Sequence, residues 1–419
     1  MLKAFRQLFS STNKDLRGRI AFTLLCLAIF CLGTTITIPW ASVIYEELGF
    51  LEIFNLMSGG GLQQFSIFAL GVSPYITASI ITQLLQMDII PYFKELKDQG
   101  YVGRQKINKI TRYLGILFAF IQAYVFCIAY LQTNDVGMLI KTTVVMTAGT
   151  AFCLWMGDQI SNKGIGNGLS MLIMAGIVQS MPKMFVTAFD GFITSGLYSR
   201  VAGGVLFGSY IVLYILVIVG IVWIQLAERR IPIQYSNKTN SAYGAQQTFL
   251  PIKINSAGVI PVIFATTFTS VIVAVAQFFG NDKVVMFIDN WISYNSVTGF
   301  ILYMLLIFFF GYFYTFLTMN PEEMSKNLNK NGGYIPGIRP GVDTSDYISN
   351  VLSKLTVVGT MFLIIVAGVP IIFSNVSKLP ASVTLGGTGL LIIVGVAIET
   401  YKQVESSLVS RSYKRSKRR

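Results

Sequence analysis

Long apolar stretches alternate with short polar segments along almost the whole chain. A helix that crosses a bilayer needs about 20 mostly apolar residues, because the hydrocarbon core is about 30 Å thick. The pattern therefore predicts an all-α integral membrane protein with ten transmembrane helices. The predicted spans are residues 20–40, 71–90, 113–131, 142–160, 168–186, 205–226, 255–278, 298–318, 355–373 and 381–400.

One apolar stretch departs from this pattern. In SGGGLQQFSIFALGVSP (58–74), three glycines precede an apolar piece that runs from Leu62 to Val72, and Gly71 and Pro74 interrupt the chain before a regular span follows. Such a piece is too short to cross a bilayer. Glycine adopts backbone dihedral angles that other residues avoid. The sequence therefore predicts a half-helix between two hinges.

Lysine and arginine are distributed unevenly between the two sides of the membrane. Of the 32 such residues, 27 lie in segments on the side of the N-terminus. Cytoplasmic segments are enriched in these residues, so both termini are predicted to be cytoplasmic. This topology accounts for most of the net charge of +13. The basic tail RSYKRSKRR is predicted to be solvated or to face lipid, rather than to form a dedicated RNA site.

Ten spans divide evenly at the external loop 187–204. Because five is odd, the second half must run opposite to the first, which is the topology of an inverted repeat with a cavity between its halves. We therefore predict an N-terminal half at 1–190 and a C-terminal half at 191–419. The second half contains two long cytoplasmic loops, at about 227–254 and 319–354.

The composition excludes several classes of function. Hydrophobic residues make up 53% of the chain and charged residues 12%, against about 25% charged residues in soluble domains. The absence of histidine excludes imidazole metal sites, histidine proton relays and Ser-His or Cys-His catalysis. The four cysteines lie within or beside apolar spans without metal-ligand spacing. Neither an enzyme nor a bound metal or cofactor is predicted.

Transport chemistry is restricted in the same way. The span cores are read as free of charge, with Glu399 at the end of the last one, whereas proton-coupled pumps usually place charged residues inside the membrane. The chain has no phosphate-binding loop of the Walker type, and GIGNG (164–168) is interpreted as a turn. These features favour a passive conduit that is driven by a partner. The two long cytoplasmic loops would bind that partner, unless they are merely long linkers.

Five motifs, in this order along the chain, resemble the SecY family, the channel subunits of the bacterial Sec protein-translocation system. The resemblance covers essentially the whole chain. The motifs are SIFALGVSPYITASIITQLLQM (66–87), GIGNGLSMLIMAGIV (164–178), INSAGVIPVIFA (254–265), GGYIPGIRPG (332–341) and GGTGLLIIV (386–394).

The resemblance implies a function for the short segment and for a constriction in the channel. The segment would be a re-entrant plug that closes an hourglass pore. Its polar residues would allow it to move out of the pore into water. Residues assigned to the plug and its hinges are Gly59, Gly60, Gly61, Leu62, Phe65, Ile67, Phe68, Gly71 and Pro74. A ring of aliphatic side chains would seal the pore around a passing chain. The ring positions are Ile76, Ile80, Leu169, Ile173, Ile263 and Ile392.

The resemblance also implies a lateral gate and a set of partners. The gate, between spans 2–3 and 7–8, would include Gln122 and Asn255, although interhelical hydrogen bonding alone could account for both. The SecA motor or the ribosome, including its RNA, would dock on Arg229, Arg230, Lys238 and Arg339. Further partners would be SecE-like and SecG-like subunits, signal sequences, nascent chains and membrane lipids. The location would be the bacterial plasma membrane.

Two other readings are compatible with parts of the sequence. A secondary transporter with an inverted five-plus-five repeat has the same topology, and a sodium-coupled site can be built from backbone carbonyls alone. A structural scaffold for membrane enzymes is the third reading. It predicts that charged replacements at the ring positions have no effect.

Overall fold

The structure, a computed structural model, describes residues 14–41, 52–86, 90–131, 135–194, 199–235, 248–279, 291, 296–377 and 386–416. The chain divides into two compact units. The first unit comprises Met1–Gly208, Ser270–Ile288 and Ser374–Arg419, and the second comprises Ser209–Thr269 and Asp289–Phe373.

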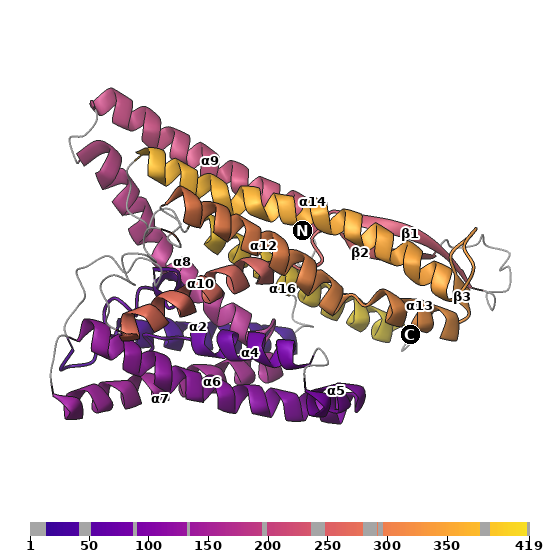
Figure 1. Ribbon diagram of the computed structural model, residues 1–419, viewed down its shortest axis with the longest axis horizontal. Coiled ribbons are helices and arrows are strands. Elements are labelled where there is room, and N and C mark those ends of the chain that lie inside the picture. Colours follow the sequence, from indigo (N-terminus) through magenta and orange to yellow (C-terminus); the bar gives the residue numbers. More distant parts are fainter. Residues whose placement is uncertain are drawn as a thin grey trace. The chain divides into compact units, whose positions relative to one another are not determined.

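The first unit is a bundle of helices (Figure 1). Within it, α6 packs against α4, α5 and α7, while α8 packs against α2, α3, α7 and α16. The helix α9 (Arg200–Leu226) begins in this unit, and α10 (Ile260–Phe279) ends in it. The other helices are α2 (Lys14–Thr35), α3 (Glu52–Met57), α4 (Ser73–Leu85), α5 (Pro91–Asp98), α6 (Tyr101–Tyr130), α7 (Val136–Lys163), α8 (Gly168–Phe189) with the π-helix η3 (Asp190–Thr194), and α16 (Gly386–Ser416).

The second unit combines long helices with a small sheet. Its helices are α12 (Val297–Thr318), α13 (Pro321–Lys330) and most of α14 (Val342–Ser377). The strands β1 (Glu228–Tyr235), β2 (Thr248–Lys253) and β3 (Gly333–Tyr334) form an antiparallel sheet in the order β2-β1-β3. The sheet lies at the same end of the unit as α13 and the start of α14 (Figure 1).

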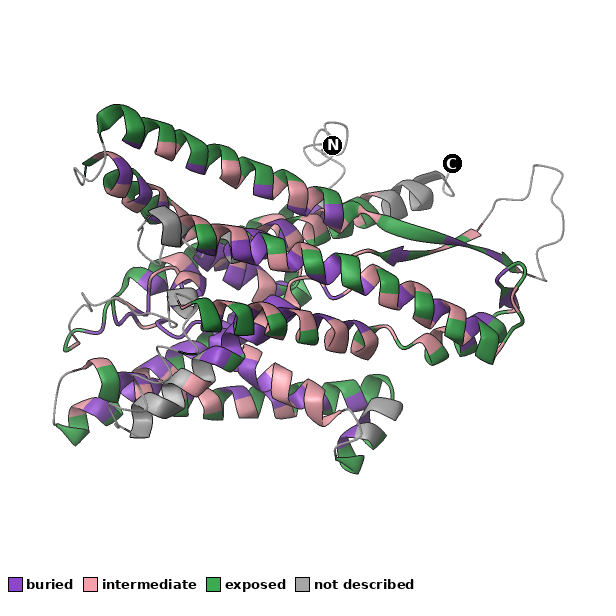
Figure 2. Ribbon diagram, turned by 45° about the horizontal axis from the view of Figure 1, so that its top comes forward, coloured by how far each residue is buried: buried purple, intermediate pink, exposed green. Residues whose placement is uncertain are grey.

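Each of the ten predicted spans overlaps a helix in the described ranges: α2, α4, α6, α7, α8, α9, α10, α12, α14 and α16. By length and composition, seven stretches of the described residues could cross a membrane. Many residues of α9 are exposed (Figure 2). Apolar residues such as Leu216 and Trp223 are among them, as expected where a helix faces lipid. The helix α4 has 13 residues, about 20 Å of length, and is therefore shorter than the predicted span 71–90.

Side-chain caps determine where several helices begin. The Asp135 carboxylate accepts from the N–H of Gly137 at the start of α7. The Ser296 hydroxyl accepts from the N–H of Gly299 at the start of α12. Such caps satisfy N–H groups that have no partner within the helix, and each is worth about 1 kcal/mol.

The half-helix predicted for residues 62–72 is wrong. Residues 58–72 form consecutive turns, and the nearest helix before them is the six-residue α3. The backbone dihedral φ is positive at Gly59, Gly60, Phe65 and Gly71, and a right-handed helix requires negative φ at every position. Contacts with α2 and the residues after it, which apolar spacing along this stretch does not reveal, hold the turns in place.

The predicted halves, 1–190 and 191–419, are the two parts of an expected inverted repeat. The two compact units are a different partition of the chain, since α16 packs on α8 in the first unit. The two halves therefore stay a prediction.

Candidate functional site

The segment of residues 55–72, here called the closing segment, is joined to the chain that follows α2. The N–H of Ile38 donates to the carbonyl of Phe65 at 2.9 Å, and the N–H of Ile67 donates to the carbonyl of Ile36 at 3.0 Å. These bonds flank an isolated antiparallel bridge between Thr37 and Ser66. The closing segment therefore has backbone partners outside itself.

Aromatic rings fix the middle of the closing segment. The ring of Phe68 is stacked between Phe30 of α2 and Phe152 of α7, with centroid distances of 6.1 and 5.7 Å. The ring of Phe65 lies 5.1 Å from that of Phe126 of α6. Both segment rings are buried. Helices α2, α6 and α7 thus all contribute to its surroundings.

Hydrogen bonds connect the closing segment to α8. The hydroxyl of Ser180 lies 3.2 Å from the carbonyl of Leu56 and 3.1 Å from that of Gly176, so these two acceptors share its one proton. The Lys183 ammonium donates to Oε1 of Gln63 at 3.0 Å. Within the segment, Oδ1 of Asn55 accepts from the N–H of Gln63 at 3.0 Å. One face of α8 therefore binds the segment at two points, one turn of helix apart.

Glycines occupy the positions where the closing segment turns sharply. The angle φ is +70° at Gly59, +82° at Gly60 and +51° at Gly71, in a region that residues with a Cβ avoid. Pro74 occupies the first turn of α4, where proline's fixed φ suits the helix. The backbone at both ends thus has the conformations that hinges need, while hinge motion itself stays a prediction.

The six predicted ring residues lie on four helices. Ile76 and Ile80 share one face of α4, Leu169 and Ile173 share one face of α8, and Ile392 lies on α16. Ile173 and Ile392 are each 8% exposed. Ile76, Ile80 and Leu169 are half-buried. The packing of α16 against α8 brings two of these helices together. Ile263, half-buried on α10, belongs to the second unit.

The two predicted gate residues have different surroundings. Gln122 is half-buried on α6 in the first unit. Asn255 is 6% exposed in the second unit, just before α10, and its Nδ2 donates to the carbonyl of Gly258 at 3.0 Å. The bond of Asn255 is therefore local to the turn before α10, instead of the interhelical bond that was considered.

The two long loops that were predicted to be cytoplasmic fold together in the second unit. Residues of β1, β2, α13, α14 and the turn after β3 share one apolar core. The described parts of both loops are therefore folded, whereas their role in binding a partner stays a prediction. The buried members of this core are Ile231, Ile233, Ile252, Leu328, Ile335, Ile348 and Leu352.

The predicted docking residues lie on this folded body. Arg229 and Arg230 are exposed on β1, and Nε of Arg230 lies 2.8 Å from a carboxylate oxygen of Glu228. Arg339 is exposed, and its carbonyl accepts from the hydroxyl of Thr344 at 2.7 Å. Lys238 lies outside the described residues. The surface thus presents guanidinium groups, which suit carboxylate and phosphate partners.

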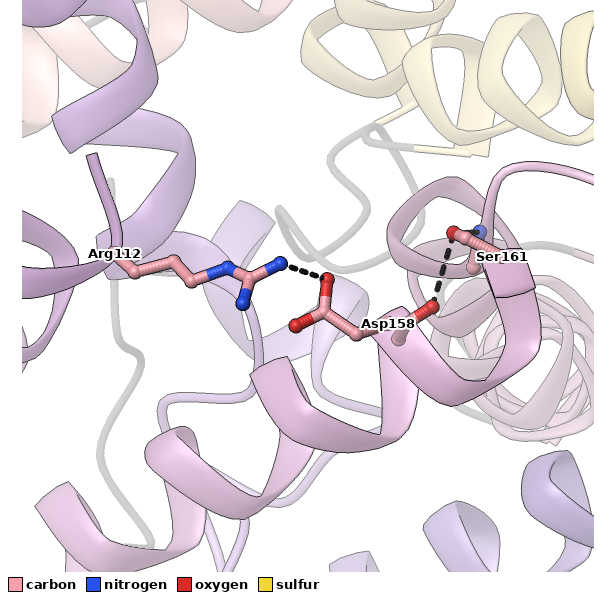
Figure 3. Close-up of polar contacts among 5 residues, drawn as sticks. Arg112, Asp158 and Ser161 are labelled. Atoms are coloured by element: carbon pink, nitrogen blue, oxygen red, sulfur yellow. Dashed lines mark hydrogen bonds and ion pairs between the residues drawn. The ribbon is translucent and has the colours of Figure 1, made fainter. Parts of the chain in front are cut away.

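One charged pair escaped the sequence reading. A guanidinium nitrogen of Arg112 on α6 lies 2.6 Å from Oδ1 of Asp158 on α7 (Figure 3). Asp158 lies inside the predicted span 142–160 and Lys183 lies inside the predicted span 168–186, so the reading of all spans as chargeless needs correction at both positions. The available signal was an acidic residue near one span end and an arginine directly before another. Pairing lowers the cost of placing either charge near hydrocarbon.

The GIGNG turn connects three helices of the first unit. The N–H of Ile165 donates to the hydroxyl of Thr23 on α2 at 3.0 Å, and the N–H of Gly166 donates to Oε1 of Gln403 on α16 at 3.1 Å. The hydroxyl of Ser161 on α7 accepts from the N–H of Gly168 at 2.9 Å (Figure 3). The interpretation of GIGNG as a turn is confirmed, because residues 164–166 are bends and not helix.

The chemistry of these sites is that of packing and hydrogen bonding. Among the described residues, no cluster of three or more metal-ligating side chains occurs. The four cysteines are free thiols on α2, α6 and α7.

Comparisons with known proteins agree with this description. The family model for SecY matches residues 66–401. The protein translocase subunit SecY of Bacillus subtilis is 44% identical over 96% of both chains. A solved protein-conducting channel, 20% identical, aligns with a TM-score of 0.67 over 94% of this chain and 93% of its own. The channel of the canine ribosome-channel complex from the endoplasmic reticulum, 18% identical, aligns at 0.62 over 94% and 93%.

Two of these findings decide the family. The matched region includes α4 to α14, part of α16, the last seven residues of the closing segment and both long loops of the second unit, and the similarity to the Bacillus subtilis protein extends over nearly the full length of both chains. The structural likeness shows the same fold. This chain therefore belongs to the SecY family of protein translocase subunits.

Proposed function

We propose that this chain is the pore-forming subunit of a protein-conducting channel in a bacterial plasma membrane. It passes unfolded preproteins outward and releases apolar helices sideways into lipid. The observation that carries this proposal is the 44% identity, over nearly the full length, to a protein translocase subunit. The chain itself supplies a path and not a reaction, in agreement with its family.

The closing segment is proposed to be the plug of this channel. It is packed by helices of the first unit through backbone bonds, stacked rings and two side-chain bonds from α8. Irregular backbone is tolerated at membrane depth only where protein or a water-filled cavity shields it. The polar side chains of Gln63 and Gln64 would let the segment leave the pore for water.

The ring and the lateral gate remain parts of the proposal. Ile76 and Ile80 share one face of α4, and Leu169 and Ile173 share one face of α8, as a constriction requires. Aliphatic side chains make a soft seal around an extended chain, and in its absence they exclude water and ions. Gln122 and Asn255 would lie along the gate through which signal sequences reach lipid.

The partners are proposed from the cytoplasmic loops and from relatives. The SecA motor or the ribosome would bind the arginines on β1 and on the turn after β3. Ribosome binding is supported by the canine complex, which has the same fold. SecE-like and SecG-like subunits would complete the channel, with both termini of this chain in the cytoplasm.

A transport assay tests the proposed function. The chain is reconstituted with its small subunits in lipid vesicles, and SecA, ATP and a preprotein with a signal sequence are added. We expect the preprotein to become protected from protease only when both SecA and ATP are present. If an ion gradient instead drives the accumulation of a small solute and the preprotein is not protected, the result would favour the secondary transporter.

A further inference from the structure

We propose that α2, α7 and α8 hold the closing segment in a seat lined by three glycines, which α8 fastens with Ser180 and Lys183. The inference rests on the proposed function, because it assigns a purpose to the residues around the plug. At each of the three glycines, a Cβ would lie within 3.0 Å of an atom of the closing segment. Each helix can therefore approach the segment this closely only because it has a glycine there.

The first glycine is Gly176 of α8. A Cβ at this position would lie 2.7 Å from the carbonyl carbon of Met57 and 3.1 Å from the backbone nitrogen of Gly59. Backbone atoms cannot move aside as a flexible side chain can. Any residue larger than glycine at 176 must therefore displace the beginning of the closing segment or α8 itself.

The second and third glycines face the other end of the segment. A Cβ at Gly149 of α7 would lie 3.0 Å from the carbonyl carbon of Ile67. A Cβ at Gly33 of α2 would lie 2.8 Å from Cζ of the Phe68 ring. Three helices thus approach residues 57–68 so closely that even a methyl group at these glycines would clash with the segment.

Strain in the segment makes the seat necessary. Phe65 has φ of +47°, a conformation that is costly for a bulky residue and persists only where its surroundings enforce it. Among the described residues, the buried hydroxyl of Ser66 has no hydrogen-bond partner, which also disfavours this conformation. The seated segment therefore depends on its contacts, and loosening those contacts should release it.

The α8 bonds fasten the seat from one side. Ser180 and Lys183 follow Gly176 by four and seven residues, so all three lie on one face of α8. Their bonds reach Leu56 and Gln63, one residue on either side of the stretch 57–62. A small movement of this face would loosen both bonds together with the Gly176 contact.

The test measures seating directly, without a preprotein or a motor. Leu62, which is 2% exposed, is replaced by cysteine in the assembled channel, and its labelling by a membrane-impermeant maleimide is timed. Halide flux through resting vesicles is recorded in parallel. The four native cysteines set a background, which the same channel without Leu62→Cys measures. Gln64→Cys, at an exposed position, should label rapidly in every variant.

Gly149→Ala and Gly176→Ala are the seat variants. Overpacking of this kind should raise labelling at residue 62 and resting halide flux by about tenfold or more. Gly18→Ala on α2 and Gly208→Ala on α9 are matched controls, because a Cβ at either position meets no atom within 4 Å. Both controls should behave as the parent channel.

Lys183→Met covers the case in which an alanine variant does not fold, because it removes the bond to Gln63 without adding volume to the seat. It should raise labelling by a smaller factor. The inference is overturned if the folded variants label and leak like Gly208→Ala. Since no preprotein is involved, this result is independent of whether SecA-dependent transport succeeds, so failure of the seat and failure of the proposed function are separate outcomes.

Discussion

At the scale of single residues, the proposed pore needs uncharged side chains at the ring positions, and the closing segment needs small residues around it. The described ring residues on α4, α8 and α16 are aliphatic, and the glycines around the closing segment leave room for its backbone. The ring assignment came from the family motifs and stays a prediction, whereas the charged pair was missed. Apolar windows average over about 20 residues, so Asp158 was hidden among its apolar neighbours on α7.

Replacement of Ile392 by asparagine tests the ring. A polar amide at an apolar constriction should admit water and ions and should relax the selection of substrates. We expect a resting ion leak and export of preproteins with defective signal sequences. Ile393→Asn, at the next position of α16, is the matched control, because its side chain points about 100° away around the helix. Equal leak and equal export in both variants would show that the ring is wrongly assigned.

Replacement of Asp158 by asparagine tests the charged pair. Arg112 would lose its carboxylate partner, but its side chain is 47% exposed, so solvent limits the effect. The variant should lower the free energy of unfolding in detergent by about 1 kcal/mol. Asp15→Asn, which affects the more exposed pair with Arg19, should have a smaller effect. In the double variant Arg112→Gln/Asp158→Asn, a loss equal to the sum of the single losses would mean that the pair contributes nothing.

At the scale of elements, the helices were predicted, a signal for one strand of the sheet was overlooked, and the turns could not be predicted. Apolar stretches in a membrane must satisfy their backbone groups internally, so they form helices. The strand β1 carried a period-two pattern in which Ile231 and Ile233 are buried, and this signal was available in the sequence. The turns of the closing segment depend on bonds to Ile36 and Ile38, which no local spacing encodes.

Replacement of Ile252 by alanine tests whether the two cytoplasmic loops act as one body. Ile252 is fully buried in their shared core, and truncation of such a side chain costs about 2–5 kcal/mol. We expect faster hydrogen exchange in β1 and β2 and weaker binding of the motor. Phe249→Ala on the same strand, at a 41% exposed position, should leave exchange unchanged. Unchanged exchange in Ile252→Ala would contradict a shared core.

At the scale of the whole molecule, the family and the all-helical membrane fold followed from sequence motifs and apolar periodicity. The arrangement of the ring, gate and docking residues did not follow from the sequence, because these residues are divided between the two compact units. Lys238 lies outside the described residues. Orientation in the membrane still depends on the distribution of Lys and Arg alone.

Thiol labelling in intact cells tests that orientation. Lys141→Cys on α7 and Lys402→Cys on α16 are both exposed positions at opposite predicted sides. An impermeant maleimide should label residue 141 from outside, and residue 402 only after the membrane is opened. The parent chain measures the background from the four native cysteines. The reverse pattern would invert the predicted topology.

The shared core of the cytoplasmic loops restricts how this protein can be recombined with its relatives. A chimera that takes residues 228–253 from another species, but keeps residues 320–352, would join two sets of side chains that were never selected to pack together. Such a hybrid should misfold at that end even if each loop works in its own parent. Partner specificity is therefore best transplanted with both loops as a single cassette.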